Sequence, residues 1–178
     1  MAQLPDPRPR PPQGRTLVDG YGRVATDLRV SLTDRCGLRC TYCMPAEGLT
    51  WLPKEGLLTD EELLRVIGVF VGLGVRTIRL TGGEPLLRRG VVDLVAAMAA
   101  LTPRPQLAMT TNGVALAGLA GPLAAAGLDR VNVSLDTISR ERFVELTRRD
   151  RLADVEAGLA AAAEAGLTPV KVNAVAMR

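Results

Sequence analysis

At 178 residues the chain is long enough for one domain with a sizeable hydrophobic core. Hydrophobic residues account for 47% of it and aromatic residues for only 3%, so the core must be aliphatic and rich in alanine. The net charge of +3 is too small to indicate nucleic-acid binding by itself. The sequence shows neither the apolar region of a signal peptide nor a run of roughly 18 apolar residues, so it indicates neither secretion nor membrane insertion.

The first 15 residues are rich in proline and arginine. Such a composition buries little apolar surface, so we expect residues 1–15 to form a disordered or extended tail. An arm that binds an anionic partner is the alternative. The folded domain is predicted to occupy residues 16–178.

The first predicted strand, residues 28–32, leads into a loop that holds every cysteine of the chain. After that loop, Thr59 and Glu62 form a capping-box pattern, which predicts a helix that ends near Gly72. Further strands are predicted at 75–80, 106–111, 130–135 and 169–175, with helices at 90–101, 115–126 and 152–165 and a short helix within 138–149. Because strands separated by helices pair in parallel through right-handed crossovers, the sequence predicts an α/β fold with about five βα units.

The predicted strands have one apolar and one polar face, because successive side chains point to opposite sides of a sheet. The apolar face carries Leu28, Val30, Leu32, Ile78, Leu80, Val131, Val133, Leu135, Val170 and Val172, and we expect helices to cover it. The polar face carries Arg29, Ser31, Thr77, Arg79, Thr81, Asn132, Ser134, Asp136, Lys171 and Asn173. In the third strand, 106–111, the alternation is weaker, but Thr110 and Asn112 fall on one face.

A polar face is unusual for parallel strands. Parallel sheets are normally covered on both sides, and closed eight-stranded barrels fill their interior with branched apolar side chains. We therefore expect an open, partial parallel β/α barrel whose inner face lines a wet or ligand-filled lumen. The alternative is a face that is simply bathed in solvent.

The three cysteines Cys36, Cys40 and Cys43 follow a C-x3-C-x2-C spacing. Structural zinc needs four nitrogen or sulfur ligands, and the chain has neither a fourth cysteine nor a histidine. An odd count disfavours a disulfide framework, and a loop interrupted by Gly37 and Arg39 is a poor place for unrelated core cysteines. A four-iron, four-sulfur (4Fe–4S) cluster with one open iron fits this spacing better. Free thiols also suit a cytoplasmic location.

Cys36, Cys40, Tyr42 and Cys43 resemble the C-x3-C-x-aromatic-C loop of the radical S-adenosylmethionine (SAM) enzymes. Further stretches resemble the GTP 3′,8-cyclase family of molybdenum-cofactor biosynthesis: 27–47, 81–85, 110–113, 133–136 and Lys171. The resemblance implies a partial barrel with the 4Fe–4S cluster on the three cysteines. It also implies SAM contacts by Tyr42, Gly83 and Ser134, and GTP contacts by Arg29, Arg79, Thr110 and Lys171.

The activity implied by this resemblance is a radical cyclisation. SAM is cleaved reductively, the 5′-deoxyadenosyl radical removes hydrogen from the ribose 3′ carbon of GTP, and that carbon attacks C8 of guanine. The product is (8S)-3′,8-cyclo-7,8-dihydroguanosine 5′-triphosphate. The implied partners are GTP and an electron donor. A homodimer is possible, and neither nucleic acid nor a membrane is implied.

Chains of this family continue into a sixth strand, a second three-cysteine cluster that holds the guanine base, and a Gly-Gly tail. We expect the present sequence to be a fragment, because its fifth strand would otherwise form an exposed parallel edge. Guanine specificity therefore cannot be argued from these residues. The alternatives are another radical SAM enzyme, such as a peptide-modifying or activating enzyme, and a non-catalytic three-thiolate metal module.

Overall fold

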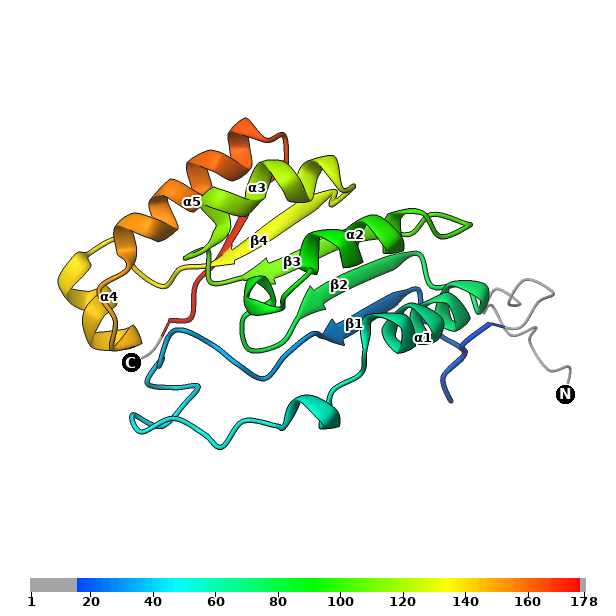
Figure 1. The fold of residues 1–178 in the computed structure, drawn as a ribbon, viewed down its shortest axis with the longest axis horizontal. Coiled ribbons are helices and arrows are strands. Elements are labelled where there is room, and N and C mark those ends of the chain that lie inside the picture. The colour runs from blue at the N-terminus through cyan, green and yellow to red at the C-terminus, as the bar shows by residue number, and fades with distance from the viewer. Residues whose placement is uncertain (1–15, 177–178) are drawn as a thin grey trace, which may run out of the picture.

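The computed structural model describes residues 16–176, and the proline-rich tail lies outside this range. Five parallel strands form one sheet in the order β1-β2-β3-β4-β5. Their bounds are Asp27–Ser31 (β1), Thr77–Thr81 (β2), Gln106–Thr111 (β3), Arg130–Ser134 (β4) and Lys171–Asn173 (β5). The sheet is open, with β1 and β5 at its edges, which confirms the predicted parallel α/β fold (Figure 1).

The α-helices alternate with these strands, as predicted. They are Asp60–Gly72 (α1), Val91–Ala99 (α2), Leu116–Ala125 (α3), Arg140–Thr147 (α4) and Leu152–Glu164 (α5). The sequence did not predict the two short 3-10 helices, Lys54–Gly56 (η1) and Pro85–Leu87 (η2). No helix in the described part of the chain has the length and apolar character needed to cross a membrane.

Helix α1 begins where the capping box predicts. The Thr59 hydroxyl accepts a hydrogen bond from the Glu62 backbone, and the Glu62 carboxylate accepts one from the Thr59 backbone at 2.8 Å. This reciprocal pair satisfies donors that a helix N-terminus leaves free. The buried residues Leu63, Ile67 and Val71 then recur at helical spacing and face the sheet.

Strand β5 is shorter than the predicted 169–175. Pro169 has no N–H to contribute to a strand ladder, and the Val175 N–H donates to the Asp136 side chain instead of to β4. Val172, which was expected beneath a helix, is 52% exposed on this edge strand. Here the predicted strand length and the predicted burial of Val172 are both wrong.

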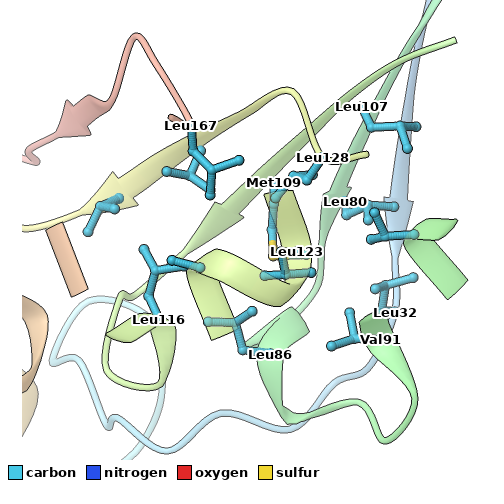
Figure 2. Packing of buried hydrophobic residues seen from close by; sticks show 14 of the residues in the cluster. Leu32, Leu80, Leu86, Val91, Leu107, Met109, Leu116, Leu123, Leu128 and Leu167 are labelled. Atoms are coloured by element: carbon cyan, nitrogen blue, oxygen red, sulfur yellow. The ribbon is translucent and has the colours of Figure 1, made fainter. Parts of the chain in front are cut away.

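Helices α1, α2, α3 and α5 lie along one face of the sheet (Figure 1). The core fills the space between these helices and the apolar strand face, and Ile78, Leu80, Val131 and Val133 are completely buried there. Figure 2 shows this layer, with Leu80, Leu107 and Met109 from the strands and Leu116 and Leu123 from α3. The predicted apolar face therefore packs as expected through the centre of the sheet. The polar face is the one opposite these helices.

Candidate functional site

The cysteine loop follows β1 and is held at the carboxyl end of the sheet by helix α4. The backbone N–H groups of Arg39 and Thr41 donate to the carbonyls of Thr147 and Leu146, each at 2.9 Å. The Arg148 guanidinium adds a 2.9 Å hydrogen bond to the Arg39 carbonyl. The carbonyls at a helix C-terminus lack intrahelical partners, so α4 is well placed to fix this loop. Sequence reasoning predicted the helix but missed this role.

The turn after β2 holds the start of the loop from another side. Gly83 donates its N–H to the Thr33 carbonyl and Glu84 donates to the Arg35 carbonyl, both at 2.7 Å. A Cβ added at Gly83 would lie 2.3 Å from the Arg35 carbonyl oxygen and 2.5 Å from that of Asp34. Only glycine allows so close a backbone approach. Gly83 thus packs against the cysteine loop, in addition to the SAM contact predicted for it.

The three thiols lie near one another on this loop. Cys36 and Cys40 are half-buried, whereas Cys43 is exposed. Burial is the main reason that the pKa of Cys40 is raised to about 11, and repulsion from the Cys36 and Cys43 thiolates adds to it. Within residues 16–176, however, no three cysteine or carboxylate side chains are spaced to surround a metal ion as they stand.

The donor set nevertheless fits the expected cluster. Iron–sulfur clusters are bound by thiolates, and these three are the only cysteines in the sequence. Metal binding and local folding are generally coupled, so thiols that do not surround a metal in the free chain are compatible with this donor set.

A small pocket lies beside Cys40. It brings together Tyr42 and Ser134, two of the predicted SAM contacts, whereas Gly83 does not line it. The Tyr42 hydroxyl donates a 2.7 Å hydrogen bond to Asp136, and burial together with this bond raises the pKa of the Tyr42 phenol. The pocket thus contacts one predicted cluster ligand and two predicted cofactor contacts.

The polar sheet face is arranged in rows set by the strand register. One row places Arg29 beside Arg79, followed by Ala108 and Arg130. The next row toward the cysteine loop places Thr110 beside Asn132 and Asn132 beside Lys171. All four predicted GTP contacts therefore lie on one face, in two adjacent rows. Sequence reasoning missed Arg130, although it lies two residues before the polar-face residue Asn132.

These cations have no carboxylate partner within residues 16–176. Among the described residues, no carboxylate pairs with the side chains of Arg29, Arg79, Arg130 or Lys171. Asp136, the main acid expected on this face, accepts hydrogen bonds from Tyr42 and from the Val175 backbone instead. Like charges on neighbouring strands destabilise a sheet, so the row fits an anionic ligand.

Two buried polar atoms in the second row also lack partners. Thr110 Oγ1 and Asn132 Oδ1 are inaccessible to solvent, and no hydrogen-bond partner for them is found within the described part of the chain. Buried polar groups are normally hydrogen-bonded, so unpartnered ones in a cationic row point to a ligand or to water.

Residues 30–178 match the family model of the Radical SAM superfamily. The chain belongs to the radical SAM superfamily. Membership carries with it the two cofactors expected from the sequence, a 4Fe–4S cluster and S-adenosylmethionine. The cysteine loop, the glycine turn and the polar face are thus parts of a radical SAM core.

Curated relatives of this radical SAM chain are named GTP 3′,8-cyclase. The one from Mycobacterium sp. (strain KMS) is 67% identical over 160 residues, which are 89% of this chain and 46% of the relative. The one from Streptomyces coelicolor is 66% identical over 162 residues, which are 90% of this chain and 48% of the relative. The chain therefore spans slightly less than half the length of the curated relatives it matches.

The fold is also found in solved structures. Streptococcus suis SuiB bound to S-adenosylmethionine superposes with a TM-score of 0.68 at 21% identity, covering 86% of this chain and 34% of SuiB. At this identity the likeness concerns the fold alone. It agrees with the open, partial barrel predicted from the strand faces.

Proposed function

We propose that this chain carries the radical-generating part of a GTP 3′,8-cyclase, with its radical SAM core in residues 16–178. The observation that carries the proposal is the row of cations on the polar sheet face, for which no carboxylate partner is found among the described residues. Sequence identity of 66–67% to GTP 3′,8-cyclases supports the same reading. GTP and an electron donor are the proposed partners.

Cys36, Cys40 and Cys43 would hold the 4Fe–4S cluster. When bound, the cluster and SAM supply one-electron chemistry that generates a carbon-centred radical. Tyr42, Ser134 and Gly83 would contact SAM. Helix α4 and the glycine turn each hold the cysteine loop through backbone hydrogen bonds, which supports this proposal.

The polar face would bind the triphosphate. Arg29, Arg79 and Lys171 supply positive charge, and we add Arg130 to this set because it shares a row with the two other arginines. Guanidinium groups form paired hydrogen bonds with phosphate oxygens, and these bonds are stronger than neutral ones. Thr110 and Asn132, whose buried oxygen atoms have no partner among the described residues, lie in the adjacent row.

Reductive cleavage of SAM tests the radical part of the proposal. We expect the anaerobically reconstituted, dithionite-reduced chain to form 5′-deoxyadenosine from SAM even without GTP, because an iron without a protein ligand leaves room for SAM. Chromatography of the quenched reaction measures the product, and Cys40→Ala is the control that should form none. If a fully loaded and reducible protein forms no 5′-deoxyadenosine, the radical assignment is wrong.

Nucleotide binding tests the cation row. We expect the chain to prefer GTP over GMP but to discriminate poorly between GTP and ATP, because the cations recognise phosphate rather than the base. Lys171→Ala should weaken GTP binding roughly ten- to a hundredfold, the usual effect of losing a hydrogen bond to a charged group. Added salt should also weaken binding. Isothermal titration calorimetry with the three nucleotides measures each of these effects.

The matched control for this experiment is Arg65→Ala. It removes one positive charge from the exposed face of α1, where Arg65 pairs with Glu61 at 3.5 Å, away from the polar sheet face. This variant should bind GTP like the wild type. Equal affinity for GTP and GMP, with no loss in Lys171→Ala, would show that the cations serve the fold rather than a nucleotide.

A further inference from the structure

The Asn112 side chain points its amide group at one of the three thiols. Its Nδ2 atom lies 3.7 Å from Cys36 Sγ, a hydrogen-bonding distance for a sulfur acceptor. The other side-chain atom of Asn112, Oδ1, accepts a 3.0 Å hydrogen bond from the Val114 backbone. Because that acceptor is already engaged, the amide cannot flip, and the N–H group must face the sulfur.

A buried carboxylate fixes the turn that carries Asn112. Glu84, only 2% exposed, accepts hydrogen bonds from the Asn112 backbone at 2.7 Å and from the Thr111 hydroxyl at 2.6 Å. The Thr111 hydroxyl in turn accepts a 3.0 Å hydrogen bond from the Gly113 backbone. The turn after β3 is thus tied to the turn after β2, which itself contacts the cysteine loop. Asn112 is therefore held toward Cys36 by contacts that do not involve Cys36.

We propose that Asn112 is a positioning residue that donates a hydrogen bond to the Cys36 sulfur and thereby raises the reduction potential of the cluster bound there. The inference rests on the proposed cluster at the three cysteines. Hydrogen bonds to cluster sulfurs are among the factors that set the potential, and groups that contact metal ligands tune the metal site. A donor favours the reduced state because that state places more negative charge on the sulfur.

Two substitutions remove the donor while keeping the turn. Asn112→Asp keeps the acceptor for the Val114 N–H but replaces the donor with a carboxylate oxygen. Asn112→Ser keeps a hydroxyl acceptor on a side chain too short to reach the sulfur. We expect Asn112→Ser to lower the equilibrium constant for cluster reduction about tenfold, or about 59 mV for a one-electron couple. Asn112→Asp should lower it further through its charge.

Gln106→Glu is the matched control. It makes the same amide-to-carboxylate change at the exposed first residue of β3, the strand that leads into the turn with Asn112, roughly 20 Å from Asn112 at about 3.3 Å per residue. Its midpoint potential should equal that of the wild type. The measurement is a redox titration followed by electron paramagnetic resonance, with iron and sulfide content determined for every variant.

A second measurement needs no variant to fold. Wild-type protein labelled with ¹⁵N in its asparagine side chains should show a ¹⁵N hyperfine coupling to the reduced cluster. If the cluster binds but no coupling is seen, or if the Asp and Ser variants keep the wild-type potential, the role of Asn112 is wrong while the cluster assignment stands. If the wild type binds no cluster at all, the proposed function fails, and this inference fails with it.

Discussion

Replacing Cys36, Cys40 or Cys43 by alanine is expected to abolish assembly of the cluster. Wild-type protein reconstituted under anaerobic conditions should contain about four irons and four sulfides per chain. Removing one of three thiolates leaves two protein ligands, and the sequence has no other cysteine and no histidine to replace the lost one. Iron and sulfide analysis, together with the visible absorption of the cluster, measures the loss.

Tyr42→Phe is the control for the cysteine variants. It changes the same loop and removes the hydrogen bond to Asp136, but it leaves all three thiols in place. We expect this variant to retain its iron and sulfide. A full cluster in any one of the three alanine variants would show that the replaced cysteine is not a ligand, and stoichiometric zinc without sulfide in the wild type would favour a structural metal module instead.

Replacing Gly83 by alanine is expected to destabilise the protein by about 3 kcal/mol, the upper end of the usual cost of overpacking. The new Cβ would lie 2.3 Å from the Arg35 carbonyl oxygen, and a backbone atom cannot move aside as a flexible side chain can. Relief of the clash requires separating the glycine turn from the cysteine loop. Urea unfolding of the metal-free protein measures the free energy of unfolding, so the test does not depend on the cluster.

Gly68→Ala is the matched control for this prediction. Gly68 lies inside α1, and a Cβ added there meets no atom within 4 Å. Alanine is preferred over glycine in a helix interior by roughly 0.5–1 kcal/mol, so this variant should be more stable than the wild type. The same chemical change should therefore have opposite effects at the two positions. Equal stability of Gly83→Ala and wild type would show that the turn does not pack tightly against the loop in solution.

The fold followed largely from local patterns. Strand β3 has the predicted bounds, and α1 begins at the predicted capping box. The alternation of apolar and polar residues placed the sheet faces correctly through the centre of the sheet. The largest error in strand length is at the edge strand β5, where Asp136 competes for the backbone N–H of Val175.

The candidate site was predictable where its residues are close in the chain. The three cysteines occupy eight consecutive residues, so the sequence by itself determined that they lie on one loop. Alternation within each strand likewise determined that Arg29, Arg79 and Lys171 share the polar face. These properties depend only on neighbours in the chain and on the period of a strand.

Only the tertiary structure decided which of these residues become neighbours. Asn112 contacts Cys36 across 76 residues, and the Glu84 carboxylate accepts a hydrogen bond from Asn112 across 28. The hydrogen bonds between helix α4 and the cysteine loop, and the position of Arg130 in the same row as Arg29 and Arg79, likewise join residues that are far apart in the chain. The alternation of side chains along a strand determines which face of the sheet each one occupies. The register between paired strands determines its row on that face, and this register depends on how the whole core packs.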